Sequence, residues 1–271
     1  MIGRTVDEAT FFMATGFTNN SKYGCYFYPQ LPVSHANNSC VMNETNFANL
    51  VSFGSSILKL DTQENSTLFQ IYKDSATTYT NRSIRILSDF IFDCDLSRFA
   101  KTYVEATQKN VYLYEYARRS PINKWPLWTG AMHGDDLVNI FGIPFRHPEK
   151  YKCENKEKEE KNKERNKREG VNKNKEKKTK CKDSVEEEQN YSEQVMWAIG
   201  NFSKTGKPNT VWEKASEDSL RSFIFNGTSS FVHITHQNFT PPTCNEFFNL
   251  MKQFMIRKMQ SQAKTSKKVK R

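Results

Sequence analysis

Residues 125–145 read WPLWTGAMHGDDLVNIFGIPF, and the interpretation of the whole chain starts from this stretch. Its single histidine, His133, stands between Met132 and Gly134. An imidazole can take a proton from a hydroxyl and later return it, because its unperturbed pKa lies near neutrality. A lone histidine beside a glycine is more often a turn residue, and no second histidine follows at i+4 to indicate a metal site. A catalytic role for His133 therefore needs support from the residues around it.

The residues on both sides of His133 follow the pattern of a known family. Trp125 stands upstream, and Gly-x-x-His-Gly, an acidic pair and Phe-Gly-x-Pro follow it. This pattern resembles the histidine loop of the type-B carboxylesterases and cholinesterases. The resemblance implies an α/β protein: the C-terminal portion of an α/β-hydrolase fold, with a mixed, mostly parallel sheet flanked by helices and incomplete at its N-terminal side. It implies no metal and no organic cofactor.

The same resemblance implies a carboxylate ahead of the histidine, because this fold orders its triad as nucleophile, acid and histidine. The family carries a glutamate in an Asp-Glu-Gly-Ser/Thr-Phe-Phe motif, and residues 7–12 read DEATFF, so Glu8 takes the acid position. Its role would be to accept the second imidazole N–H and to stabilise the imidazolium. Taken alone, Glu8 would be interpreted as a solvated strand end.

Three aromatic residues are candidates for the substrate pocket: Phe11, Phe12 and Trp125. The two phenylalanines follow Glu8 where cholinesterase-like proteins place aromatic rings, whose faces attract quaternary ammonium groups. Packing in the core is the alternative role for each ring. Thr15 stands where choline-selective relatives often have a tyrosine, which argues against a choline ester as the substrate.

The nucleophile of the triad is absent from the sequence. The family places its serine in a Gly-x-Ser-x-Gly elbow, and neither Gly54-Ser55-Ser56 nor residues 227–230 supply the second glycine. The chain therefore resembles a fragment of a carboxylic ester hydrolase, and we expect it to be inactive alone. Two alternatives stay open. One is a non-catalytic cholinesterase-like domain for adhesion or interaction, and the other is a truncated chain that does not fold.

Charge is concentrated in two segments of a chain whose formal net charge is +10. Between residues 150 and 182, fifteen Lys or Arg residues are mixed with seven Glu residues. Such a segment cannot bury enough apolar surface to offset the entropy cost of ordering. Residues 150–183 are therefore predicted to be a disordered insertion and residues 259–271 a basic disordered tail. Because glutamates interrupt the lysines and no aromatic residue alternates with them, nucleic acid is not the expected partner.

The rest of the chain is predicted to form one folded unit. Residues 1–149 and 184–258 are assigned to the C-terminal half of the carboxylesterase domain. The predicted elements are a strand and helical turn in 2–17, a helix near 88–108 with Phe92, Leu96, Phe99 and Tyr103 on its apolar face, a buried strand at 111–116, a helix in 191–209 capped by Gly206, a hairpin in 220–234 and a last helix at 245–258. Asp135 and Asp136 are predicted to begin a helix and to interact with its dipole.

Six cysteines indicate an oxidising compartment. Cys25 and Cys40 bracket a stretch that a disulfide would close into a surface loop. Cys153 and Cys181 stand at the two ends of the insertion and suggest a second bridge. The family resemblance implies a third bridge, which joins Cys94 to Cys244.

The same compartment is favoured by a series of Asn-x-Ser/Thr acceptor sites. They are at Asn19, Asn37, Asn43, Asn65, Asn81, Asn190, Asn201, Asn226 and Asn238. We therefore expect a secreted or extracellular glycoprotein whose signal peptide is encoded upstream. The expected partner is a small carboxylic ester bound by the full-length parent. A homodimer and an association with a membrane both stay open.

Overall fold

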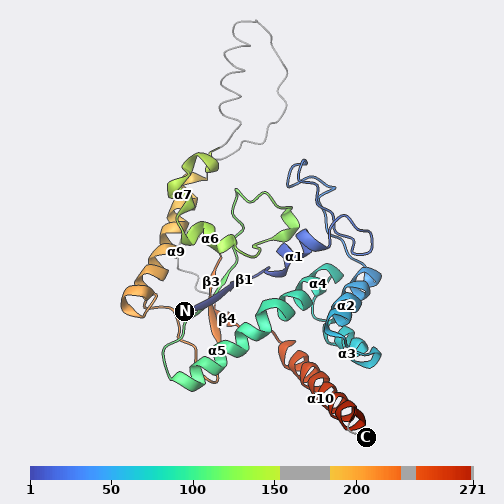
Figure 1. Ribbon diagram of the computed structural model, residues 1–271. Coiled ribbons are helices and arrows are strands. Elements are labelled where there is room, and N and C mark those ends of the chain that lie inside the picture. The colour runs from blue at the N-terminus through green and yellow to red at the C-terminus, as the bar shows by residue number, and fades with distance from the viewer. Residues whose placement is uncertain (153–183, 227–235, 270–271) are drawn as a thin grey trace, which may run out of the picture.

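A mixed sheet lies at the centre of the protein (Figure 1). The computed structural model describes residues 1–152, 184–226 and 236–269. Within them the sheet has the order β1-β2-β3-β4, with the strands β1 (Ile2–Thr5), β2 (Leu113–Tyr116), β3 (Arg221–Phe225) and β4 (His236–Asn238). The first three strands run parallel, and β4 pairs antiparallel with β3. The sheet is thus mostly parallel and flanked by helices, as predicted for part of an α/β-hydrolase fold.

Helices account for most of the remaining described residues. The α-helices are α1 (Ala9–Gly16), α2 (Glu44–Leu58), α3 (Thr62–Tyr72), α4 (Tyr79–Ser88), α5 (Cys94–Thr107), α6 (Asp135–Ile140), α7 (Ile143–Arg146), α9 (Val185–Thr205) and α10 (Cys244–Val269). A π-helical turn, η1 (Asp89–Asp93), joins α4 to α5, and the 3-10 turns are η2 (Leu127–Thr129) and η3 (Pro148–Tyr151). Among the described residues, no helix combines the length and the apolar character that crossing a membrane requires.

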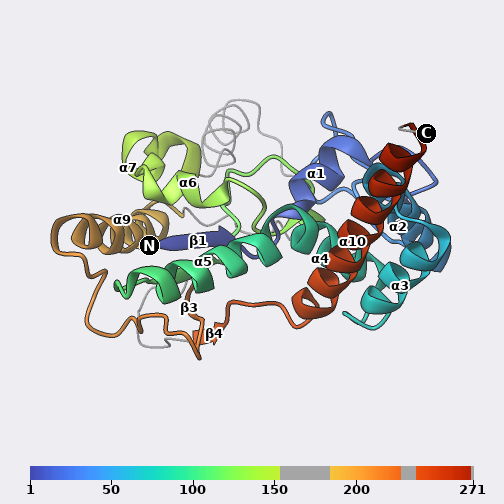
Figure 2. The same cartoon turned by 60° about the horizontal axis from the view of Figure 1, so that its bottom comes forward.

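The two faces of the sheet pack against different helices, and β2 shows why. Successive side chains of a strand point to opposite faces. Leu113 joins a buried cluster with Ala100 and Val104 of α5, whereas Tyr116 joins a cluster with Val195 of α9. In Figure 2, β1 correspondingly runs between α5 and the group formed by α6, α7 and α9. Both faces of β2 are therefore buried, as predicted for residues 111–116.

The remaining helices form a third apolar cluster beside the sheet. It joins α2, α3, α4 and α10 through fully or nearly fully buried side chains, among them Phe47, Leu50, Leu68, Tyr72 and Leu250. Two of these helices begin with a capping box, in which Asn43 and Asp61 accept a backbone N–H from the third residue of the helix. The start of each helix is thus encoded locally, and its packing is provided by the cluster.

Two disulfides are present in the described residues. Cys25 is joined to Cys40, which closes the surface loop. Cys94 is joined to Cys244, the pair that the family resemblance implies, across a sequence separation of 150. The second disulfide ties the start of α5 to the start of α10. Cys153 and Cys181 lie outside the described residues, as does most of the predicted insertion at 150–183.

The predicted apolar face of the helix near 88–108 is wrong in its second half. Phe99 and Tyr103 are 56% and 43% exposed, whereas Ala100 is fully buried and Val104 nearly so. The physical reason is η1, because a π-helical turn contains an extra residue and shifts every following position around the axis. Small side chains then face the sheet. The buried hydroxyl of Ser97 is satisfied, because it donates a hydrogen bond to the carbonyl of Asp93 at 2.7 Å.

The later elements follow the predictions more closely. α9 ends at Thr205, and Gly206 takes the left-handed conformation (φ 75°) expected of a helix cap. β3 corresponds to the first strand of the hairpin predicted in 220–234, but its antiparallel partner β4 begins at His236, beyond that range. Residues 227–235 lie outside the described residues. α10 continues past the expected end at Lys258 to Val269. That stretch contains neither glycine nor proline, the two residues that most readily end a helix.

Candidate active site

Glu8 and His133 meet beyond the carboxyl end of the parallel strands. Glu8 follows β1, and His133 lies on the loop that leaves β2. The Nδ1 atom of His133 is 2.7 Å from Oε2 of Glu8, and Oε1 of Glu8 accepts the backbone N–H of Thr5 at 2.7 Å. The Glu8 side chain is only 8% exposed, whereas that of His133 is 45% exposed. The carboxylate thus fixes one edge of the ring and leaves much of the ring accessible.

The backbone ahead of His133 is fixed by Asp7. Its Oδ2 atom accepts the N–H of Ala131 at 3.0 Å, and burial raises the pKa of this carboxyl. Gly130 adopts φ 57°, and a Cβ atom there would lie 2.1 Å from Oδ2 of Asp7. Only glycine therefore allows this close approach. The two consecutive acids thus have different tasks, since Asp7 holds the loop and Glu8 holds the imidazole.

Aromatic rings surround the imidazole of His133. Phe92 stacks on it with a centroid distance of 5.0 Å and an interplanar angle of 23°. Phe11 and Phe12 lie at 6.0 and 5.8 Å, and Trp125 packs edge-on against Phe11 at 5.7 Å. The three aromatic residues predicted for the pocket therefore gather near His133. Phe92 was not among them, because its helical spacing indicated the core.

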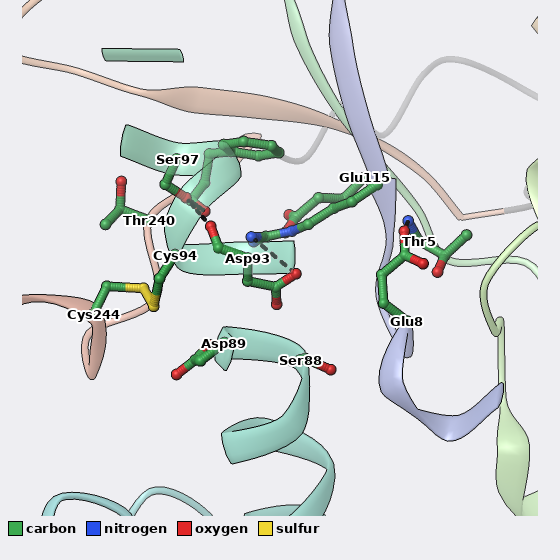
Figure 3. A network of polar contacts seen from close by, with 12 residues as sticks. Thr5, Glu8, Ser88, Asp89, Asp93, Cys94, Ser97, Glu115, Thr240 and Cys244 are labelled. Atoms are coloured by element: carbon green, nitrogen blue, oxygen red, sulfur yellow. Dashed lines mark hydrogen bonds and ion pairs between the residues drawn. A yellow bond between two sulfur atoms is a disulfide. The ribbon is translucent and has the colours of Figure 1, made fainter. Parts of the chain in front are cut away.

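A network of buried charges lies behind the site, as Figure 3 shows. The Nε atom of Arg4 donates to Oε1 of Glu115 at 2.9 Å, and its Nη1 atom is 3.5 Å from Oδ1 of Asp93. Asp93 and Asp89 both pair with Arg85. Since Arg4 and Thr5 are neighbours in β1, the network anchors the strand that leads into Glu8. It also reaches the Cys94–Cys244 disulfide, which lies beside it in the same view.

Ser55 and one group of potential metal ligands lie in the described part of the chain, and neither forms an additional site there. Ser55 lies in α2 and donates its hydroxyl to Asn65 at 2.6 Å, while residues 227–230 are outside the described residues. The described residues contain a buried group that could offer metal ligands, formed by Asp89, Cys94 and Cys244. Its two sulfur atoms already form a disulfide. They are therefore not available as thiolate ligands.

A mostly parallel sheet, with a carboxylate and a histidine joined on loops beyond its strands, defines an α/β-hydrolase type of protein. The comparisons with known proteins name the family. The sequence profile of the carboxylesterase family matches residues 1–166. This chain belongs to the carboxylesterase family.

The similar proteins are much longer than this chain. Acetylcholinesterase 4 of Caenorhabditis briggsae is 33% identical over 151 residues, which cover 51% of this chain and 20% of that protein. Acetylcholinesterase-1 of Trittame loki is 38% identical over 72 residues, covering 26% of this chain and 13% of that protein. The cholinesterase of Mus musculus is 21% identical over 167 residues, covering 59% and 22%. The matched part thus spans about a fifth of these relatives or less.

Proposed function

We propose that this chain supplies the acid and the histidine of a carboxylic ester hydrolase, with Glu8 as the acid and His133 as the residue that transfers the proton. The 2.7 Å contact between Glu8 Oε2 and His133 Nδ1 is the observation that supports this most directly. Membership of the carboxylesterase family supports an ester as the substrate class.

In the proposed reaction, a serine hydroxyl attacks the ester carbonyl while Nε2 of His133 takes its proton. Glu8 accepts the Nδ1–H of the ring, so the imidazolium that forms is stabilised and its tautomer is fixed. His133 then gives the proton to the departing alcohol. In the second half of the reaction water attacks the acyl group, His133 takes a proton from this water, and it returns a proton to the serine oxygen as the acid leaves. Phe11, Phe12 and Trp125 would form part of the apolar wall around the ester.

The serine is not part of this sequence, which has no Gly-x-Ser-x-Gly pentapeptide. We therefore propose that a longer product of the same gene provides it and that residues 1–271 alone do not hydrolyse esters. The proposal stops at the ester class and names no alcohol, although similar proteins carry acetylcholinesterase in their names. Thr15, at a position where choline-selective relatives often have a tyrosine, gives no support for a choline ester.

The proposed location is extracellular. The disulfides Cys25–Cys40 and Cys94–Cys244 fit an oxidising compartment, and the Asn-x-Ser/Thr sites would then be available to glycosylation. The division into a carboxylesterase unit with a Lys/Glu-rich insertion at 150–183 and a basic tail from 259 also belongs to the proposal. In chain order, the insertion falls between η3 and α9.

The test measures hydrolysis of p-nitrophenyl acetate and acetylthiocholine by the longest protein product of the gene that contains residues 1–271. We expect turnover that falls by roughly 10³- to 10⁴-fold in both His133→Ala and Glu8→Gln. Asp136→Asn, in the first turn of α6 close to His133, is the matched control and keeps its activity. The chain of residues 1–271 should show no turnover. A longer product without a serine elbow and without activity would refute the proposal and favour an interaction domain.

A further inference from the structure

Glu8 holds the ring of His133, but a separate set of contacts holds the backbone that carries the ring. The N–H of Met132, directly before His133, donates to Oδ2 of Asp135 at 3.1 Å. The N–H of Asp135 donates back to the carbonyl of Met132 at 3.0 Å. His133 and Gly134 are therefore enclosed between two reciprocal hydrogen bonds. Gly134 allows this tight turn with a φ of 84°.

Asp135 also links this turn to the segment that carries Trp125. Both carboxylate oxygens of Asp135 lie 3.0 Å from Nδ2 of Asn123. The Oδ1 atom of Asn123 in turn accepts the N–H of Trp125 at 2.8 Å. One buried carboxylate, 7% exposed, thus connects the histidine turn to the tryptophan segment.

We propose that Asp135 is a positioning residue for His133, which holds the imidazole at the distance where Glu8 can accept its Nδ1–H. This inference deepens the proposed function and rests on it for the meaning of His133. It differs from the sequence prediction, in which Asp135 only interacts with a helix dipole. The half-buried member of the acidic pair, Asp136, does not share this role, because its Oδ2 atom accepts the hydroxyl of Tyr114 at 3.2 Å.

The charges around Asp135 are consistent with a carboxylate held in place for its hydrogen bonds. The charged and titratable side chains that interact with Asp135 are those of Arg119, Asp136 and Tyr116. Burial raises the pKa of Asp135 to about 6, while the Met132 N–H, Asn123 and Arg119 oppose that rise. Burying a carboxylate costs free energy unless hydrogen-bond donors compensate for the lost water. For Asp135 these donors are the N–H of Met132 and the side-chain amide of Asn123.

The test follows the Nδ1–H proton of His133 by NMR in the full chain of residues 1–271, labelled with ¹⁵N-histidine and assigned by its loss in His133→Gln. In Asp135→Asn we expect this proton to exchange with water at least about tenfold faster, because one hydrogen bond to a charged group contributes more than 1.4 kcal/mol. The backbone amide of Met132 should lose protection in the same variant. Asn123→Ala, which leaves the Met132 bond intact, should show a smaller increase.

Two comparisons separate positioning from a general loss of structure. The amide of Val195, deep in the core, should exchange as slowly in Asp135→Asn as in the wild type. Asp136→Asn should leave the His133 proton unchanged. A His133 proton that exchanges within twofold of wild type in Asp135→Asn, or that speeds up only together with Val195, overturns the inference. Because no turnover is measured, this failure is distinct from a failure of the ester hydrolysis test.

Discussion

Replacing Arg4 by leucine removes the cation at the centre of the buried network. The Arg4 side chain is 5% exposed, and its two acidic partners, Glu115 and Asp93, are 4% and 3% exposed. Its guanidinium also lies 4.4 Å from the centroid of the Phe239 ring. Leucine preserves most of the apolar packing but removes the arginine partner of Glu115 and one of the two arginine partners of Asp93.

The expected loss in the free energy of unfolding depends on the partners that each carboxylate keeps after the substitution. Breaking a buried pair by removal of one partner typically costs about 3–5 kcal/mol. Asp93 keeps its contact with Arg85, and Glu115 keeps the hydroxyl of Ser222 at 2.9 Å and the amide of Gln237. We therefore expect the lower end of that range, about 3 kcal/mol, for Arg4→Leu.

Urea denaturation followed by circular dichroism and by tryptophan fluorescence measures this change in the free energy of unfolding. Arg98→Leu is the matched control, since Arg98 and Asp95 form a pair that is 63% and 66% exposed. It should change stability by less than about 0.5 kcal/mol. The double variant Arg4→Leu/Glu115→Gln should recover part of the loss, because the carboxylate that has lost its arginine partner is then replaced by a neutral amide. A loss in Arg4→Leu no larger than that in Arg98→Leu would refute the reasoning.

Three further changes test other parts of the structure. Gly3→Ala should destabilise by about 1–3 kcal/mol in thermal unfolding, because the new Cβ would lie 2.1 Å from the ring of Tyr114; a neutral result contradicts the packing of β1 on β2. The Cys94→Ser/Cys244→Ser variant should lose roughly 5 kcal/mol by the chain-entropy estimate for a loop of 150 residues, measured against the oxidised protein. Since the folded state raises the pKa of Asp135 to about 6 from 3.8, it binds that proton more tightly than the unfolded state. Stability from this group should therefore decrease by roughly 3 kcal/mol as pH rises from about 4 to 6, and that slope should be absent in Asp135→Asn.

Much of the site could be anticipated because it is encoded in short motifs. The spacing around His133 and the DEATFF segment around Glu8 are local patterns, and so is the Gly206 cap of α9. The structure adds that the two motifs lie side by side, with the carboxylate bonded to the ring.

Other parts of the site depend on contacts that no local pattern contains. Phe92 has the spacing of a core residue, but it lies in the π-helical turn and stacks on the imidazole of His133. Asp135 begins a helix as predicted, yet it also accepts from the Met132 N–H and from Asn123, which stands 12 residues earlier in the same connection after β2. The exposed positions of Phe99 and Tyr103 have the same origin, because a single extra residue in η1 changes the face that meets the sheet.

The sheet order, which repeats the chain order, has a consequence for how the protein is made. Ile2 of β1 lies opposite Leu113 of β2, and Leu113 lies opposite Ser222 of β3. Once the ribosome has released the chain beyond His133, both residues of the Glu8–His133 contact are therefore available to fold. Glu8 and His133 can come together while β3 and α10 are still being translated, and the Cys94–Cys244 bond can close only afterwards.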